Sequence, residues 1–479
     1  MSDILIKNGW LFNGRSENIL TKSDLLIHNG QIQAIGKIQS SRLGTKIING
    51  EGRIVSPGFI DLNSQLDSDY RENKSLDDSL FLRQGITTAI IGSSGQSIFK
   101  HFLPPLPGKT KLETNLGSGN ERERLLLSYN KDCPNFNLSS FLGWTTLNNW
   151  GIQNSLQLAI LLNQIKNNFA GLSLEFRKEN RDENLKQLNE LVSVLSKRAK
   201  NLMLFFSNSL PDESLIKSLG QLSLNNQMSI VLDCPLLGCA LDNDIILHLA
   251  EEENKKGANL VFKLWPYEVI QYELNEVNGL LGSKISGTKN LEKIVLSSPL
   301  FGSQVPQILR GKTLEEIKKN WNIDLKAALS KISILFPQCH FKILIPYHIS
   351  EDWWDSSLSY VGVNSALVSA DDIVGPNVFS GINHFLETHL AGAPADRWPQ
   401  TLAKITSQPA LIAGLTNRGF LQKDYLADIV IINPDKLKGI GDYQNPTSEG
   451  EGIETVIMNG QIVWQKGRVW KRKVGKLLI

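Results

Sequence analysis

The stretch from Arg53 to Asp67 constrains the fold more than any other part of the sequence, because a short apolar run leads directly into polar residues. The turn pair Pro57-Gly58 lets the chain change direction, and Phe59-Ile60 then begin an apolar strand. Beyond this strand every second residue is polar, namely Asp61, Asn63, Gln65 and Asp67. Alternate residues of an extended chain share one face. The pattern predicts a buried strand with polar side chains at its carboxyl end.

Both ends of the chain show the sequence pattern of β-hairpins. Residues 4–9 and 25–30 each finish in Asn-Gly, and residues 32–36 read as a partner strand. Residues 427–433 and 453–464 are further strands, with another Asn-Gly turn inside the second segment. Chain termini commonly lie close together. We therefore expect one small β-sandwich built from residues 1–55 and 421–479.

Between residues 56 and 420, short apolar runs alternate with helical stretches, which is typical of α/β folds. The strand candidates are residues 87–92, 171–176, 202–206, 230–233, 260–264 and 366–369, and two of the helices are expected at 183–199 and 242–253. A helix capped near Ser75 should end near Gly85. The count and spacing predict a (β/α)₈ TIM-like barrel, whose chemistry lies at the carboxyl ends of the strands.

A polar, helix-forming segment at about 284–345 interrupts the alternation of strands and helices, and it is expected to be an inserted subdomain. Gly311-Lys312-Thr313 resembles part of a phosphate loop, but Pro306 stands where that motif needs its first glycine. Thr313 as a helix N-cap, with Glu316 three residues later, explains the segment better.

Composition excludes several classes of protein. The 479 residues are 41% hydrophobic and 20% charged, and 50 Lys and Arg are balanced by 48 Asp and Glu, which argues against a nucleic-acid-binding surface. No apolar run approaches the roughly 20 residues that span a bilayer, so no membrane role is expected. The scattered cysteines indicate free thiols and a cytoplasmic protein; they are Cys133, Cys234, Cys239 and Cys339.

Pro57-Gly-Phe-Ile-Asp61 resembles the first-strand signature of the amidohydrolase superfamily, most closely its N-acyl-D-amino-acid deacylase (D-aminoacylase) branch. In that signature an x-His-x-His pair follows, whereas this chain has Asn63 and Gln65. The resemblance continues through nearly the whole chain, in segments 82–88, 171–173, 257–267, 311–316 and 396–434. It implies the barrel, the sandwich and a zinc-dependent hydrolysis of carbon–nitrogen bonds other than peptide bonds.

The same resemblance places the former metal-site positions at five residues of this chain, of which the two carboxamides and the serine are poor zinc ligands. They are Asn63, Gln65, Ser94, Asp233 and Asp371. Ser94 stands for a bridging cysteine, Asp233 for the histidine of the fifth strand, and Asp371 for an aspartate that contacts metal and moves protons. A carboxamide oxygen is a weak donor to zinc, and a serine hydroxyl stays protonated. We therefore expect no zinc and no other cofactor.

Asp371 is the catalytic candidate, and Asp61, Asp67, Lys263 and Tyr267 are candidate pocket residues. Two carboxylates, Asp61 and Asp371, can do acid–base work without a metal, although bracing of loops is the favoured interpretation. None of the seven histidines stands at a motif position. The aromatic group Trp353, Trp354 and Tyr360 is expected to pack in the core, with an oligomer interface as the rival interpretation.

Three functions follow from these observations. The favoured one is a pseudoenzyme that has lost metal and hydrolysis and acts as a binding or structural partner, in a homo-oligomer or beside an active paralogue. The second is an active amidohydrolase with a rebuilt site, cleaving an N-acyl amino acid or a cyclic amide with Asp371 as the base. The third is a metal-free binder of a small-molecule ligand. Bound zinc would favour the second, and a ligand-shaped pocket without metal the third.

Overall fold

The computed structural model describes most of both termini and much of the central region. The described residues are 3–39, 43–62, 64, 79–91, 123–126, 144–147, 171–175, 185, 189, 192–193, 196, 203–207, 212–233, 243–267, 269–273, 312–335, 342–346, 349–363, 375–442 and 447–470.

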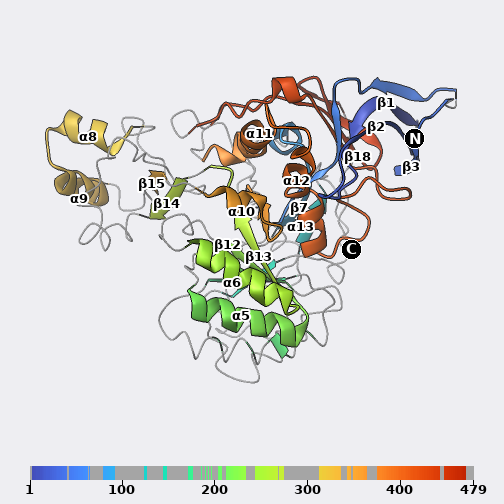
Figure 1. Ribbon diagram of the computed structural model, residues 1–479. Helices are drawn as coiled ribbons and strands as arrows, with labels where there is room; N and C mark the ends of the chain where they lie inside the picture. The colour runs from blue at the N-terminus through green and yellow to red at the C-terminus, as the bar shows by residue number, and fades with distance from the viewer. Residues whose placement is uncertain are drawn as a thin grey trace, which may run out of the picture.

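Strands from the two ends of the chain form one nine-stranded sheet in the order β20-β19-β18-β17-β5-β1-β2-β3, with β4 paired to β1. Its strands are β1 (Ile4–Leu11), β2 (Thr21–His28), β3 (Gln31–Gly36), β4 (Lys46–Asn49), β5 (Ile54–Pro57), β17 (Ile429–Ile432), β18 (Ile453–Met458), β19 (Gln461–Gln465) and β20 (Arg468–Val469). Figure 1 shows the blue N-terminal strands beside the red strand β18. The prediction that both termini build one β unit is confirmed.

Two of the three Asn-Gly turns lie where the sequence predicts them. Asn29-Gly30 joins β2 to β3 with φ values of 50° and 84°, and Asn459-Gly460 joins β18 to β19 with 47° and 71°. Positive φ at both central residues is the geometry of a type I′ hairpin turn. The turn expected at Asn8-Gly9 is wrong, because β1 continues to Leu11 across a shift in register there. The Asn8 N–H donates to the Asp24 carboxylate, 2.9 Å away, which stabilises a bulge instead of a turn.

Among the described residues, eight strands of the barrel run parallel in two sheets, β6-β7 and β16-β13-β12-β11-β10-β9, in agreement with the predicted fold class. They are β6 (Phe59–Asp61), β7 (Ile86–Ile91), β9 (Trp144–Leu147), β10 (Gly171–Glu175), β11 (Met203–Ser207), β12 (Ser229–Asp233), β13 (Asn259–Leu264) and β16 (Ser359–Val361). Strand β7 also pairs with the antiparallel β8 (Glu123–Leu126). The gap between β16 and β6 is closed by the segment at Lys404 and Ile405. Val361 N–H donates to Lys404 O (3.0 Å), and Ile60 N–H donates to Ile405 O (2.9 Å).

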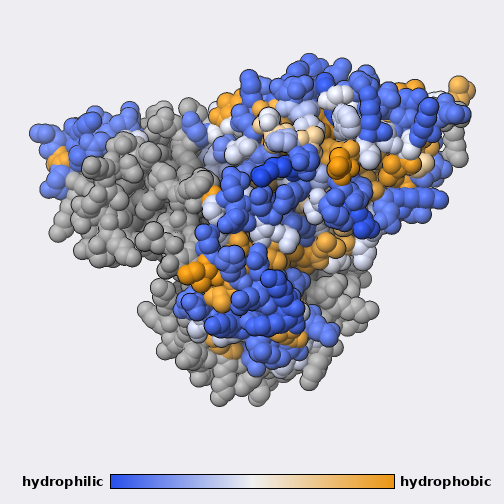
Figure 2. All heavy atoms as spheres, in the orientation of Figure 1, coloured by the Kyte–Doolittle hydropathy of each residue, from blue (hydrophilic) through white to orange (hydrophobic). Residues whose placement is uncertain are grey.

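Helices pack around the barrel strands. They are α2 (Ser79–Arg83), α5 (Glu213–Asn226), α6 (Asn243–Lys255), α10 (Glu351–Asp355), α11 (Asn377–His389), α12 (Trp398–Ala403) and α13 (Ser407–Ile412). In α5, Leu215, Ile216 and Leu219 are buried at helical spacing against the sheet. Figure 1 shows α5 and α6 side by side beneath β12 and β13, and Figure 2 shows that their outward face is hydrophilic.

Gly58 explains how the chain passes from the sandwich to the barrel within one residue. Strand β5 ends at Pro57 and β6 begins at Phe59. A Cβ atom at Gly58 would lie 2.1 Å from Thr87 Oγ1, so only glycine fits between β5 and β7. The backbone of Gly58 also donates to Asp428 O beside β17, at 2.8 Å. The Pro57-Gly58 pair therefore fixes the junction of the two units.

The segment expected as an inserted subdomain contains α8 (Leu314–Trp321) and α9 (Leu325–Leu335), which lie away from the barrel in Figure 1. The antiparallel pair β14 (Val269–Glu273) and β15 (Lys342–Pro346) brackets it in the sequence. The predicted cap is confirmed, because Thr313 and Glu316 form a reciprocal capping box at the start of α8. The exact domain boundaries stay predictions, and the strand expected at 366–369 lies outside the described residues.

The aromatic group of the sequence analysis packs in the core, as favoured there. Trp353, Trp354 and Tyr360 are 2%, 6% and 0% exposed. Among the described helices, none combines the length and the apolar character that crossing a membrane requires.

Candidate functional site

Three polar side chains stand next to one another on neighbouring strands near the carboxyl end of the barrel. Asp233 is the last residue of β12 and pairs in register with Lys263 of β13, which pairs with Tyr360 of β16. Residues in register on parallel strands project from the same face of the sheet. That face is the barrel interior, because Tyr360 packs in one buried cluster with apolar residues of β6, β7, β12 and β13.

Asp233 and Lys263 form a buried ion pair. The ammonium Nζ lies 3.0 Å from Asp233 Oδ2, and the two side chains are 0% and 7% exposed for Lys263 and Asp233 respectively. The other carboxylate oxygen, Oδ1, accepts the indole N–H of Trp265 at 2.8 Å. The same indole ring lies 4.1 Å below the ammonium, so it also provides a cation–π contact. Each charge thus has hydrogen-bonding or charged neighbours, as burial of an ion pair requires.

The backbone of β16 makes room for this lysine. A Cβ atom at Gly362 would lie 2.6 Å from Lys263 Cε and 3.1 Å from Cδ. Any larger residue at position 362 would displace the lysine stem from its place beside Asp233. Gly362 is therefore part of the arrangement that holds the ammonium.

Tyr360 presents a buried hydroxyl to the same interior. Its side chain is fully buried, and its Oη has no hydrogen-bond partner among the described residues. Burial raises the pKa of Tyr360 well above 10, and the negative charges of Asp233 and Asp61 raise it further. The phenol accordingly stays protonated and acts as a hydrogen-bond donor at neutral pH.

Asp61, the last residue of β6, is 2% exposed and contributes a second carboxylate to this region. The described charges are therefore two carboxylates and one ammonium. The remaining positions predicted from the sequence lie outside the described residues; these are Asn63, Gln65, Asp67, Ser94 and Asp371.

Tyr267, a candidate pocket residue, is turned toward helix α11. Its hydroxyl donates to Gly441 O at 2.8 Å and lies 3.1 Å from Ser380 Oγ, and its ring stacks on His384 at 4.3 Å. Burial raises the pKa of Tyr267 to about 12. Tyr267 thus joins the segment after β13 to the connection between β17 and β18.

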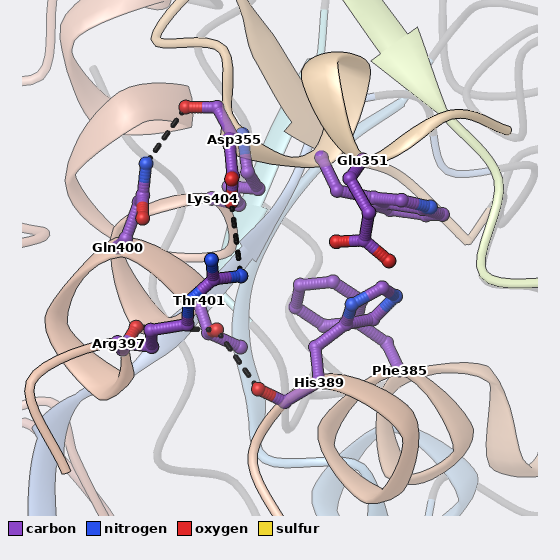
Figure 3. Close-up of a pocket in the computed structure, with 9 residues that line it drawn as sticks. Glu351, Asp355, Phe385, His389, Arg397, Gln400, Thr401 and Lys404 are labelled. Carbon is purple, nitrogen blue, oxygen red and sulfur yellow. Dashed lines mark hydrogen bonds and ion pairs between the residues drawn. The ribbon is translucent and has the colours of Figure 1, made fainter. Parts of the chain in front are cut away.

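A second, smaller hollow lies between α10, α11 and α12 (Figure 3). His389 lines it, with its ring tilted against that of Trp354 at 4.3 Å between centroids, and Figure 3 shows the Glu351 carboxylate pointing toward the imidazole. Burial and then the charge of Lys404 lower the pKa of His389 to about 4. The cavity holds about 30 Å³, which is the room of a water molecule rather than of an organic ligand.

Lys404, on the wall of this hollow, is a structural residue. Its Nζ donates to Ser356 O at 2.7 Å, to Ser359 Oγ at 2.6 Å and to Ser359 O at 3.2 Å. Burial lowers the pKa of Lys404 to about 7, whereas these acceptors favour the ammonium form. The contacts tie the start of β16 to the segment that closes the barrel.

Comparison with known proteins finds similar deacylases. No protein-family model matches the chain. N-acyl-D-glutamate deacylase of Alcaligenes xylosoxydans xylosoxydans is 22% identical over 98% of this chain and 96% of its own length. D-aminoacylase of the same organism is 35% identical, but only over 16% of each chain.

Solved structures agree with the sequence comparison. N-acyl-D-glutamate deacylase from Bordetella bronchiseptica, solved with zinc and a phosphonate inhibitor, matches with a TM-score of 0.72 at 19% identity over 98% of both chains. A D-aminoacylase structure matches with a TM-score of 0.61 at 16% identity, again over 98% of both chains. At these identities the structural likeness shows the fold alone, a barrel with a β-sandwich.

Of the five predicted metal-site positions, the structure describes Asp233. Among the described residues, no group of three or more His, Cys, Asp and Glu side chains could hold a metal ion. Asp233 already uses one oxygen for Lys263 and the other for Trp265, and a divalent cation beside a buried ammonium would be repelled. Both carboxylate oxygens of Asp233 are thus engaged within the protein.

Proposed function

We propose that this chain, a D-aminoacylase-like amidohydrolase by full-length sequence similarity and by fold, has lost metal binding and hydrolysis and works as a metal-free binding or structural protein. The observation that carries the proposal is the Lys263–Asp233 ion pair, 3.0 Å long and buried at the carboxyl end of β12 and β13. In barrels of this type the chemistry takes place at that end.

The loss of hydrolysis follows from the chemistry of water. A bound metal lowers the pKa of its water to about 7 and so supplies hydroxide at neutral pH. The Lys263 ammonium carries a single charge that Asp233 already balances. Without a metal, attack on an amide depends on a carboxylate base and a neutral water, which is a much weaker nucleophile.

A second candidate is an active hydrolase of carbon–nitrogen bonds other than peptide bonds. It is favoured by the full-length similarity to a protein named N-acyl-D-glutamate deacylase. In this reading Asp371 acts as the base on water. The third candidate, a metal-free binder of small molecules, is one form of the binding role proposed above.

N-acetyl-D-glutamate separates these readings, because both binding and cleavage of one compound can be followed. We expect no release of free amine from the purified protein, with or without added zinc. Calorimetric titration on the same sample reports binding independently. Turnover that is lost in an Asp371→Asn variant would contradict the proposal and establish the hydrolase.

Partners are part of the proposal as well. A homo-oligomer or a complex with an active paralogue would give a non-hydrolytic copy a structural role. Light scattering of the pure protein, followed by mixing with a paralogue, distinguishes the two.

A further inference from the structure

The sandwich contains more Asn-Gly pairs than its hairpin turns use. Besides the turns, the described residues include Asn13-Gly14 and Asn49-Gly50. An asparagine that precedes glycine is prone to lose its side-chain amide, because glycine has no Cβ to hinder the attack of its own nitrogen. Each pair is therefore a candidate site of chemical modification, and the fold decides which pair can react.

The reaction needs a free backbone nitrogen in the glycine. This nitrogen gives up its proton and bonds to Cγ of the asparagine, the Cγ–Nδ2 bond breaks, and ammonia leaves with the proton. Water then opens the cyclic imide at one of its two carbonyls and leaves aspartate or isoaspartate. A glycine N–H that donates a hydrogen bond must first lose that bond, so the bond protects the asparagine.

Asn13-Gly14, just beyond the end of β1, meets this requirement. The N–H of Gly14 has no hydrogen-bond partner among the described residues. The side chain of Asn13 is exposed to water. Its Oδ1 accepts the N–H of Arg15 at 2.9 Å, which holds the amide carbon beside the backbone that follows.

Asn49-Gly50, at the end of β4, has the same sequence and a protected glycine. Asn49 is exposed, and its Oδ1 accepts the N–H of Glu51 at 3.1 Å, the same contact that Asn13 makes. The N–H of Gly50, however, donates to Lys7 O at 2.7 Å. The two pairs are therefore matched in sequence, exposure and side-chain contact, and they differ in the hydrogen bond of the glycine.

The other described pairs are held in regular structure. Asn8-Gly9 lies inside β1. The N–H of Gly460 donates to Ala427 O at 3.0 Å. In the turn Asn29-Gly30, the Asn29 amide nitrogen lies 3.0 Å from His28 Nε2, so an attack on this amide requires the turn to open.

We propose that Asn13 is a site of spontaneous deamidation in the folded protein, and that its conversion to isoaspartate loosens the junction between β1 and the segment before β17. The backbone carbonyl of Asn13 accepts the N–H of Leu421 at 3.1 Å at this junction. The inference involves neither the barrel interior nor a metal. Its failure therefore leaves the proposed function untouched.

The packing of Gly14 gives the modification its structural effect. Gly14 has a φ of 99°, and a Cβ atom there would lie 2.5 Å from Phe420 Cδ1 and 2.7 Å from Gly419 O. The backbone thus requires glycine, and the reactive pair is tied to the fold. Isoaspartate adds one methylene to the main chain before Gly14, which displaces this residue from Phe420.

The experiment follows amide loss by mass spectrometry in the full chain, incubated in mildly alkaline buffer either folded or unfolded in urea. The unfolded chain gives the intrinsic rate of each pair. We expect folding to slow Asn49 roughly tenfold more than Asn13, the effect of one hydrogen bond that must open. Asn8 shares a tryptic peptide with Asn13, so fragment spectra assign the site and Asn8 is a second protected control.

Equal slowing of Asn13 and Asn49 by folding, or a faster reaction at Asn49 in the folded protein, would overturn the proposal. Asn13→Gln should stay intact, because its longer side chain cyclises much more slowly. The matched variant Asn49→Gln should still convert at Asn13.

Stability tests the structural effect on the same samples. Fresh wild type and fresh Asn13→Gln should unfold at similar urea concentrations. After the incubation the midpoint of the wild type should be lower, whereas that of Asn13→Gln should be unchanged. An equal loss in both aged proteins would show that the conversion does not loosen the junction and would overturn that part of the proposal.

Discussion

Lys263 and Asp233 depend on each other, because each is buried where an unpaired charge would be costly. Lys263→Met keeps the length of the stem but leaves the carboxylate without its cation. We expect a loss of about 3–5 kcal/mol in the free energy of unfolding. The double variant Lys263→Met with Asp233→Asn removes both charges and should recover most of that loss. Urea denaturation of the four proteins measures the coupling, and additive losses would show that the pair is not energetically joined.

His389 predicts a specific dependence of stability on acid. Its pKa is about 4 in the folded protein and 6.5 in the unfolded chain, so the unfolded chain binds more protons between these values. Stability from this group is present above pH 6.5 and falls as the pH drops toward 4. The groups facing the ring are Glu351, Asp355, Arg397, Lys404 and His384.

His389→Phe keeps an aromatic ring against Trp354 and Phe385 but cannot be protonated. We expect the wild type to lose more unfolding free energy than this variant between pH 7 and pH 4.5. Urea titrations at both pH values test this, and parallel losses would mean that the imidazole titrates normally.

Individual contacts were predictable from the sequence where they depend on residues close together in the chain. The Thr313 and Glu316 cap and the Asn29-Gly30 turn depend only on neighbouring residues, and both are confirmed. Asn8-Gly9 has the sequence of a hairpin turn, but Asp24, which is distant in the sequence, stabilises a bulge in β1 there. The hydrogen bond from the Trp265 indole to Asp233 could not be predicted from the sequence, because the pairing of β12 with β13 is what brings the two residues together.

At the scale of elements, helix α11 contains a kink that another element fills. Ser380 has φ −146° and ψ 18°, outside the helical region. The buried amide of Gln84, just after α2, donates to Val378 O at 2.6 Å and accepts from Ile382 N–H at 3.0 Å. These two backbone groups would bond each other in an uninterrupted helix. The side chain of Gln84 therefore replaces one backbone hydrogen bond of helix α11.

Gln84→Leu should leave both backbone groups buried without partners. We expect a loss of about 2–5 kcal/mol in the free energy of unfolding, as the sum of two orphaned groups. The control is Gln221→Leu on the exposed face of α5, where a change within about 0.5 kcal/mol is expected. Similar effects of the two substitutions in urea denaturation would contradict the role assigned to Gln84.

Elements were predictable from the sequence where apolar periodicity is strong, as in β12, β13 and α6. The closing contacts were not, because Lys404 and Ile405 bond to β16 and β6 through backbone oxygens, and the Lys404 ammonium adds hydrogen bonds to Ser359. The kink in α11 was equally hidden, since it depends on a residue almost 300 positions away.

At the scale of the whole molecule, the chain keeps the fold of its relatives from end to end. The sandwich, the barrel and the Pro57-Gly58 junction all follow from patterns in the sequence, and the likeness to N-acyl-D-glutamate deacylase covers 98% of the chain. The cytoplasmic location stays a prediction. The site proposed for this chain is local, namely a lysine–aspartate pair at the carboxyl end of the barrel.

The most direct test of the central claim is the metal content of the protein purified without chelators. Zinc, iron, manganese and nickel are measured by elemental analysis, and zinc is then titrated into the same sample. The account predicts well below one equivalent of any metal and no stoichiometric uptake of added zinc. One tightly held equivalent per chain would contradict it, because a complete set of ligands would then have to exist despite the Lys263–Asp233 pair.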